Sequence, residues 1–160
     1  MPPFNCSPSW RPVADQPMKS TFFILMALLA VTACTPKPLV IPEEAPDYYS
    51  LTLFDRINRY RTSCGLDALR WDSGLALLAR DHSINMFRRE KSSHRGFDKR
   101  FRQAGSWVCV ENVGWNYPSP QHMFEGWRQS DGHNDNMLND RVNRVGIAEV
   151  GRYVTYFACM

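Results

Sequence analysis

Two histidines and one glutamate, far apart in the sequence, are the residues of this chain best suited to chemistry. They are His94, Glu111 and His133. Two imidazoles and one carboxylate could bind a divalent metal such as zinc and leave one coordination position open, as in a catalytic zinc site. They could equally form a hydrogen-bonded cluster in which the carboxylate raises the pKa of a histidine. Both interpretations require a fold that brings the three side chains together.

Ser130 is a further candidate, because it lies three residues before His133. Its hydroxyl could act as a nucleophile beside the imidazole. Residues i and i+3 across the end of a helix rarely reach the geometry of a catalytic triad, however, and the sequence offers no third group. We therefore expect Ser130 to be a hydrogen-bonding residue at the C-terminal end of a helix.

Apolar residues at helical spacing predict two helices in the first half of the domain that must position these residues. The first begins near Tyr48 and ends at a glycine stop, Cys64-Gly65. The second is capped by Asp72 or Ser73, and its buried stripe includes His82. We expect His82 to be a core histidine with a satisfied ring nitrogen rather than a ligand.

The second half of the domain predicts strands separated by a helix. Residues 107–113 alternate like a strand, and Ser119-Pro120 begins a third helix that Gly132 ends. Residues 142–159 form a closing hairpin. This order of elements predicts an α/β domain over residues 48–160, with a mostly antiparallel sheet covered by helices on both faces.

The segment before this domain indicates export and attachment to a membrane. Its apolar run is too short to cross a bilayer, and it ends in Val31-Thr32-Ala33-Cys34, which resembles the lipobox of bacterial lipoproteins. We therefore interpret residues 18–33 as a lipoprotein signal peptide and Cys34 as the lipidated residue. An ordinary secretory signal or an uncleaved anchor is the alternative. Residues 1–17 precede a suitable start at Met18, and we interpret them as a mis-assigned start.

Residues 34–47 carry the lipidated cysteine and a proline-rich stretch, which predicts a semi-rigid tether of roughly 40 Å. Lipid on Cys34 would attach the protein to a membrane without a spanning helix. Thr35 stands where an Asp would retain a lipoprotein at the inner membrane. We therefore expect the protein in the bacterial cell envelope, at the outer membrane and facing the periplasm.

Three cysteines fall within the domain, Cys64, Cys109 and Cys159. An exported protein can form disulfides, but three cysteines cannot all pair with one another. Cys109 and Cys159 both lie in strand-like segments, so the sequence favours that pair, and Cys64 in a turn is the rival partner.

The formal net charge of +3 is too small, and the charges too scattered, to indicate a nucleic-acid surface. One denser basic stretch could contact anionic lipid head groups, although a solvated helix and loop is the more ordinary interpretation. This stretch contains Arg88, Arg89, Lys91, Arg95, Lys99, Arg100 and Arg102.

With their flanking residues, the two histidines and the glutamate resemble the CAP superfamily of cysteine-rich secretory proteins, antigen 5 and pathogenesis-related proteins, in its bacterial SCP-like branch. The resemblance covers nearly the whole domain, in ordered blocks. These are Ile57-Asn58-x-x-Arg61, Gly65-Leu66-x-x-Leu69-x-Trp71-Asp72, Leu75-x-x-x-Ala79-x-x-His82-x-x-x-Met86, Ser93-His94-x-Gly96, Glu111-Asn112-Val113, Trp127-x-x-Ser130-x-x-His133-x-x-Asn136-x-Leu138 and Val145-Gly146-Ile147-Ala148.

The resemblance implies an α-β-α sandwich with a large cleft lined by two histidines and two acidic residues. His94 and His133 match the histidines, and Glu111 matches the acidic residue on a strand. Ser130 occupies the second acidic position, which implies a weaker site, and Asn134 replaces the arginine usual in bacterial relatives.

The function implied is that of a lipid-anchored envelope protein whose cleft binds a ligand or partner, without catalysis and without a required cofactor. A lipid, a cell-wall fragment or an envelope protein could be bound, and we expect a monomer. The alternative is a metal-assisted envelope peptidase or other hydrolase that uses His94, Glu111 and His133, and a third possibility is a cluster that only braces the fold. Four aromatic residues are expected around the cleft, where they could line an apolar groove, although core packing is their default role: Trp107, Trp115, Tyr117 and Trp127.

Overall fold

The computed structural model describes residues 48–160. The predicted start at Met18, signal peptide, lipidated Cys34 and tether lie outside the described residues. Within the described domain, no helix is both long enough and apolar enough to cross a membrane.

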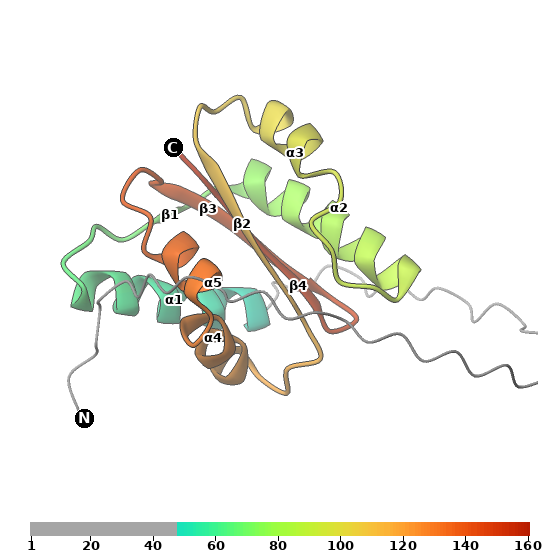
Figure 1. The fold of residues 1–160 in the computed structure, drawn as a ribbon, viewed down its shortest axis with the longest axis horizontal. Helices are drawn as coiled ribbons and strands as arrows, with labels where there is room; N and C mark the ends of the chain where they lie inside the picture. Colours follow the sequence, from blue (N-terminus) through green and yellow to red (C-terminus); the bar gives the residue numbers. More distant parts are fainter. Residues whose placement is uncertain (1–47) are drawn as a thin grey trace, which may run out of the picture.

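One sheet with helices on both faces forms the domain (Figure 1). In residues 48–160 the strands are β1 (Arg70–Trp71), β2 (Cys109–Trp115), β3 (Arg144–Val150) and β4 (Tyr153–Cys159), in the order β1-β3-β4-β2. The pairs β3–β4 and β4–β2 are antiparallel, and β1 is parallel to β3. The mostly antiparallel sheet is therefore confirmed.

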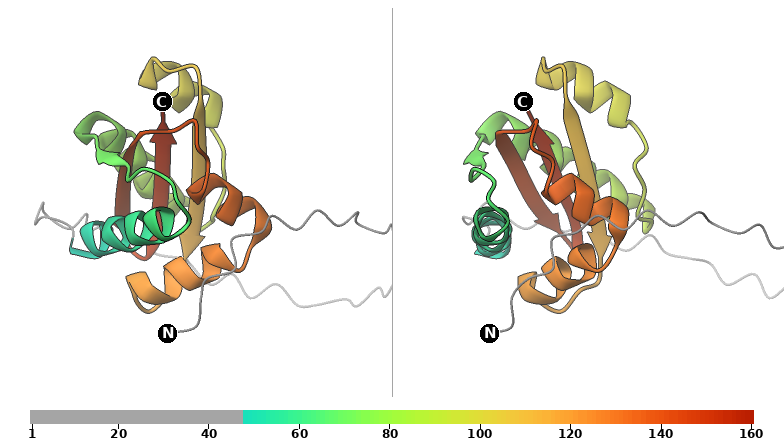
Figure 2. Two further views of the ribbon diagram at one scale, coloured as in Figure 1. Left: turned by 90° about the vertical axis from the view of Figure 1, so that its left-hand side faces the viewer. Right: turned by 60° about the vertical axis from the view of Figure 1, so that its left-hand side comes forward.

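The helices separate into two layers, which the turned views of Figure 2 also show. Helices α2 (Ser73–Arg89) and α3 (Phe97–Ala104) cover one face of the sheet. Helices α1 (Tyr48–Ser63), α4 (Pro120–Arg128) and α5 (Asp131–Met137) cover the other. This arrangement confirms the predicted α-β-α sandwich.

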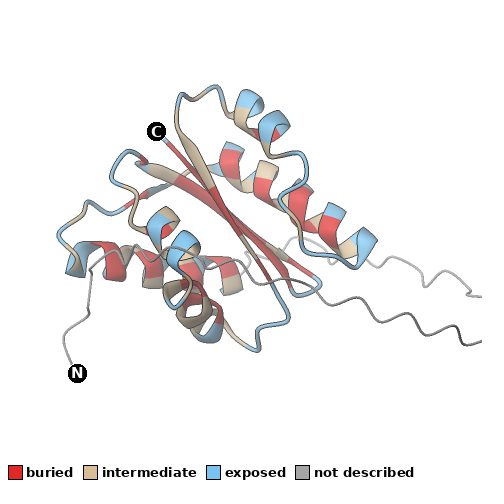
Figure 3. Ribbon diagram, viewed as in Figure 1, coloured by how far each residue is buried: buried red, intermediate tan, exposed pale blue. Residues whose placement is uncertain are grey.

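The central strand β4 is enclosed by both layers, and all its residues are buried (Figure 3). Its neighbour β3 packs closely against α2. Gly146 permits this contact, since a Cβ at that position would clash with the backbone of Leu75 and Ala76. The two strands turn at Gly151 and Arg152, whose φ angles of 56° and 70° suit a tight two-residue hairpin turn. The predicted hairpin therefore forms the middle of the core.

Local signals set two of the helix starts as predicted. The Asp72 carboxylate accepts a hydrogen bond from the Leu75 amide and caps α2. Ser119 caps α4, with Pro120 as its first residue.

The sequence places β2 two residues too early, at 107–113, because alternation of apolar and polar residues indicates a strand better than its ends. It also predicts that Gly132 ends the third helix, which is wrong. Helix α4 ends at Arg128, and Gly132 lies inside α5, a short helix that the sequence pattern does not predict. A Cβ at Gly132 would meet no other atom, so no close approach requires glycine there.

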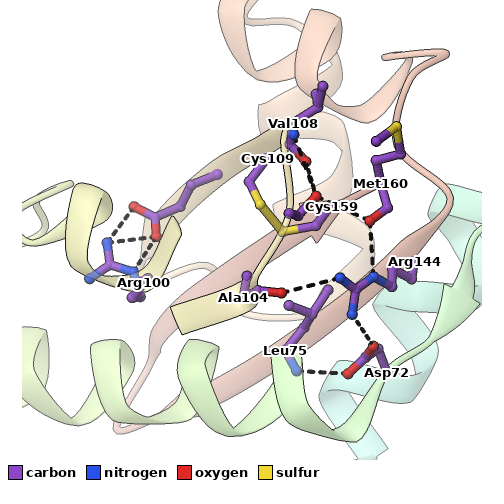
Figure 4. Close-up of a disulfide and its surroundings, with 11 residues drawn as sticks. Asp72, Leu75, Arg100, Ala104, Val108, Cys109, Arg144, Cys159 and Met160 are labelled. Carbon is purple, nitrogen blue, oxygen red and sulfur yellow. Dashed lines mark hydrogen bonds and ion pairs between the residues drawn. A yellow bond between two sulfur atoms is a disulfide. The ribbon is translucent and has the colours of Figure 1, made fainter. Parts of the chain in front are cut away.

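A disulfide joins Cys109 on β2 to Cys159 on β4, at paired positions of the two strands (Figure 4). This is the pair that the sequence favours over one with Cys64. The bond closes a separation of 50 residues, for which loop entropy gives about 4 kcal/mol of stabilisation. It attaches β2, the strand that carries Glu111, to the centre of the sheet.

Candidate functional site

Glu111 on β2 is at the centre of the site, and its carboxylate is nearly completely buried. Arg100 from α3 donates two hydrogen bonds to it, from Nε to Oε2 at 2.7 Å and from Nη2 to Oε1 at 2.8 Å. The Arg100 side chain is itself buried. A buried, bidentate pair of this kind is strong and well oriented, and it is costly to break from one side.

The sequence does not identify Arg100 as a site residue and groups it with a solvated basic stretch. That interpretation is wrong for Arg100, which is buried, whereas its neighbours Lys99 and Arg102 are exposed. The burial expected for Glu111 is a signal that could have indicated such a partner. A glutamate on a strand covered by helices needs a cationic or hydrogen-bonding partner if it is to be buried.

His94 meets Glu111, as the cluster interpretation requires. Its Nδ1 lies 2.9 Å from Oε1 of Glu111. The imidazole is supplied by the loop between α2 and α3, and 54% of its side chain remains exposed. His94 is therefore the part of this cluster that solvent or a ligand can reach.

His82 is the core histidine that the sequence predicts, with only 3% of its side chain exposed. Its Nε2 lies 2.6 Å from the Ser93 carbonyl oxygen, which can only accept, so this nitrogen carries the proton. Burial lowers the pKa of His82, partly offset by the Glu111 carboxylate 3.8 Å away. His82 therefore holds the loop that carries His94, as a neutral donor.

The backbone of His133 lies on the side of β2 that Asn112 faces, opposite the Glu111 carboxylate. Its carbonyl oxygen accepts a hydrogen bond from the Asn112 side chain at 2.9 Å. Asn112 in turn accepts from the Asn136 side chain at 2.8 Å. Because neighbouring residues of a strand point to opposite faces, Glu111 faces α2 and α3 while Asn112 faces α5.

The imidazole of His133 pairs with Ser130, whose hydroxyl lies 3.0 Å from Nδ1. Burial, together with the nearby His94, lowers the pKa of His133 and favours its neutral form. The two histidines are thus electrostatic neighbours, but they do not share a hydrogen-bonding partner in the described domain.

Ser130 is the N-cap residue of α5, so its predicted place at a helix C-terminus needs correction. It follows the cap of α4 directly, and the two helices meet there. A triad is not formed, because no carboxylate of residues 48–160 bonds the His133 ring. The Ser130–His133 pair therefore lacks the third group that activates a nucleophile.

The site residues do not fit a divalent metal. Both oxygens of Glu111 are bonded to the Arg100 guanidinium, a cation that would repel a metal ion at that carboxylate. Across residues 48–160, no three His, Cys, Asp or Glu side chains are placed to hold one ion. The arrangement supplies instead a buried ion pair with one half-exposed imidazole.

The aromatic residues do not gather around one groove, contrary to expectation. Trp127 is buried in the core, and its indole N–H donates to the Val113 carbonyl at 3.2 Å. Trp107, just before β2, is 87% exposed, and Trp115, its last residue, is 53% exposed. The strand between them is roughly 20 Å long. Tyr117 packs over Gly126 on α4.

Comparison with known proteins agrees with this fold. The sequence profile of the Cysteine-rich secretory protein family, CAP, matches residues 54–160. The chain is 30% identical over 117 residues to the "Uncharacterized membrane protein YlbC" of Bacillus subtilis (strain 168). That match covers 64% of this chain and 32% of the relative, so the chain spans about a third of that protein's length.

Two solved structures share the fold at lower identity. An extracellular protein containing a SCP domain from Bacillus anthracis superposes with a TM-score of 0.66 at 23% identity, over 74% of this chain and 44% of that one. An outer surface protein from Borrelia burgdorferi has a TM-score of 0.67 at 15% identity, over 75% of this chain and 98% of that one. The family profile covers well over half of the chain, and the chain therefore belongs to the CAP family of cysteine-rich secretory proteins.

Proposed function

We propose that this chain is a non-catalytic, lipid-anchored protein of the bacterial cell envelope whose CAP domain binds a ligand or partner beside His94. The observation that carries the proposal is the state of Glu111. Its two oxygens already accept from Arg100 and His94, so it is not available as a general base or as a metal ligand. Such a site is suited to binding a ligand without catalysing a reaction.

The accessible groups are two imidazoles of different character. His94 is half exposed and oriented by a buried carboxylate, so its outward ring nitrogen can bond a ligand. His133 is partly buried and held neutral, with one ring nitrogen engaged by Ser130. A ligand with hydroxyl or amide groups, such as a cell-wall fragment, suits ring nitrogens that can donate or accept hydrogen bonds.

Attachment to the envelope is proposed from the lipobox-like segment ending at Cys34 and from the proline-rich stretch after it. Lipid on Cys34 would hold the domain at the outer membrane, on the periplasmic side. The similar proteins include a membrane protein, an extracellular protein and an outer surface protein, which supports a place at or beyond the membrane. Fatty-acid labelling that is abolished in Cys34→Ser tests this part, and a labelled Cys34→Ser protein would contradict it.

The binding proposal is tested by sedimenting the full-length protein with purified peptidoglycan and with phosphatidylcholine vesicles. We expect one of the two to be bound, and at least about tenfold more weakly by His94→Ala, the loss of one oriented hydrogen-bonding group. His122→Ala, at an exposed histidine of α4, is the matched control and should bind as the parent does. Binding that is equal in both variants would remove His94 from the site.

The metal-assisted hydrolase is tested by a separate experiment. Equilibrium dialysis against zinc should show no stoichiometric, tight binding, and a peptide substrate should remain intact. Tight zinc that is lost in His94→Ala, together with peptide cleavage, would replace the binding function with the hydrolase.

A further inference from the structure

We propose that the cavity between α2 and α3 is a second binding site, specific for a phosphate-bearing anion. The cavity has a volume of about 380 Å³, in the lower part of the range of small-molecule sites. Five cationic side chains line it, with a single carboxylate among the lining residues. They are Arg88, Arg89, Arg95, Lys99 and Arg100, and the carboxylate is Asp81.

The cations come from three separate pieces of chain that the fold brings together. Arg88 and Arg89 lie in the last turn of α2, Arg95 in the loop, and Lys99 and Arg100 in α3. Two turns make this possible. Glu90 ends α2 in a left-handed conformation, and Gly96, with a φ of 81°, begins α3. The chain therefore doubles back, and both helices present basic residues to the same space.

The loop that lines one side of the cavity is held in place by internal hydrogen bonds. Arg100 donates from Nη1 to the Arg95 carbonyl at 3.1 Å, and His82 donates to the Ser93 carbonyl at 2.6 Å. Arg100 itself is anchored on the buried Glu111 carboxylate. A site whose walls are fixed before binding loses less entropy when the ligand enters.

Four of the five cations are not neutralised by the protein. Arg100 is paired with Glu111, but no carboxylate of the described domain forms an ion pair with Arg88, Arg89, Arg95 or Lys99. Arginines elsewhere do have such partners, as in the Arg144–Asp72 pair at 2.8 Å. Four unpaired like charges around one cavity repel one another, and an anion within it would relieve that repulsion.

The chemistry of the lining indicates the class of ligand. Guanidinium groups bond phosphate oxygens in pairs, a geometry that a single small anion such as chloride cannot satisfy. Apolar side chains also line the cavity, from Leu78, Ile84 and Met86. A phosphate attached to a small organic group, such as glycerol phosphate, therefore fits better than inorganic phosphate alone. It could come from the head group of an anionic phospholipid or from a free phosphorylated compound.

The test uses the full chain carrying Cys34→Ser, so that lipid attachment does not contribute to membrane binding. Two probes separate the sources of phosphate: sn-glycerol 3-phosphate in solution, followed by calorimetry, and mixed phosphatidylcholine–phosphatidylglycerol vesicles, followed by sedimentation. Vesicles of phosphatidylcholine alone provide the neutral reference. Binding to vesicles alone assigns a lipid head group, and binding to glycerol phosphate as well assigns a site open to free phosphate compounds.

The variant Arg88→Glu/Arg95→Glu reverses two cavity charges from different segments. We expect it to weaken binding of the responding probe by at least about tenfold. The matched control is Arg70→Glu/Arg141→Glu, which changes the net charge equally at exposed arginines that do not line the cavity. It should stay within about twofold of the parent. If the double reversal does not fold, as judged by circular dichroism, Arg95→Gln and Lys99→Gln carry the same comparison.

Two results would overturn the proposal. One is that glycerol phosphate shows no binding and the mixed vesicles bind no more strongly than the neutral ones. The other is an equal loss in the cavity and control variants, which would indicate attraction to net charge rather than a site. His94→Ala should keep anion binding intact, since His94 does not line the cavity, and this separates the second site from the one proposed beside His94.

Discussion

The two faces of strand β2 differ in how they hold polar groups within the domain. On the α2–α3 side, Glu111 is bonded to a guanidinium and an imidazole, and the contacts are between charged or chargeable groups. On the α5 side, Asn112 joins Asn136 and the His133 carbonyl through neutral amide bonds. Consecutive residues of one short motif thus supply two unlike half-sites, separated by the strand itself.

This contrast explains why the side chains of His94, Glu111 and His133 do not share one hydrogen-bonded cluster in the described domain. The strand sends the Glu111 side chain toward Arg100, while the backbone of His133 is fixed from the opposite face by Asn112. A charged half-site that lacks one partner is destabilised more than a neutral one. Four experiments test that difference, from the largest expected effect to the smallest.

The largest effect is expected from Glu111→Ala, which leaves the buried Arg100 guanidinium without its counter-charge. We expect a loss of about 3–5 kcal/mol in the free energy of unfolding, measured in urea. The double variant Glu111→Leu/Arg100→Met removes both charges and should recover much of that loss. A loss below about 1 kcal/mol in the single variant would show that the pair is not buried as described.

Asn112→Ala tests the neutral face at the neighbouring position. Asn112 is fully buried and forms two side-chain hydrogen bonds, so we expect a loss of about 2–3 kcal/mol. Asn85→Ala on the exposed side of α2 is the control and should lie within about 0.5 kcal/mol of the parent. If Asn112→Ala lost more unfolding free energy than Glu111→Ala, the neutral face would contribute more to stability than the charged face, contrary to the prediction.

Ser130→Asp converts the neutral half-site into a charged one, restoring an acidic residue at the position where the family pattern has it. The new carboxylate would replace a hydroxyl 3.0 Å from Nδ1 of His133. We expect the pKa of His133 to rise by about one unit or more relative to the parent, as seen in its NMR titration. An unchanged titration would mean that the two side chains do not meet.

The smallest effect is the pH dependence contributed by His82. Its pKa is lowered on folding from the ordinary value of 6.5, so the unfolded chain binds a proton more readily. The contribution of His82 to the free energy of unfolding is therefore fully present above about pH 6.5, and it is lost as the pH drops toward the folded-state pKa. We expect His82→Gln to remove roughly 1 kcal/mol of the stability change between pH 7 and 5. A slope that is unchanged in His82→Gln would assign the dependence to other groups.

Much of the fold could be predicted, because its signals are local. Asp72 and Ser119-Pro120 begin helices by capping chemistry that needs no distant partner. The hairpin follows from apolar runs interrupted at Gly151-Arg152. The start of β2 and the existence of α5 were less accessible, since both depend on packing against the rest of the domain.

The candidate site was less predictable for the same reason. Arg100 looks like an ordinary member of a basic helix until α3 is placed over Glu111. Ser130 looks like the end of one helix because nothing in its neighbours indicates that another begins there. The sequence does not distinguish the environments of the four aromatic residues, but their exposed fractions range from 2% for Trp127 to 87% for Trp107.

The sequence by itself determined the family, most of the helical and strand segments, and two residues of the buried cluster, His94 and Glu111. It could do so because spacing, capping and ordered motifs act over a few residues. The tertiary structure decided which of these residues meet. The pairing of Glu111 with Arg100, the separation of His133 from that pair and the gathering of basic side chains between α2 and α3 depend on how the layers pack across the sheet. Such contacts join residues from different elements, and no local pattern records them.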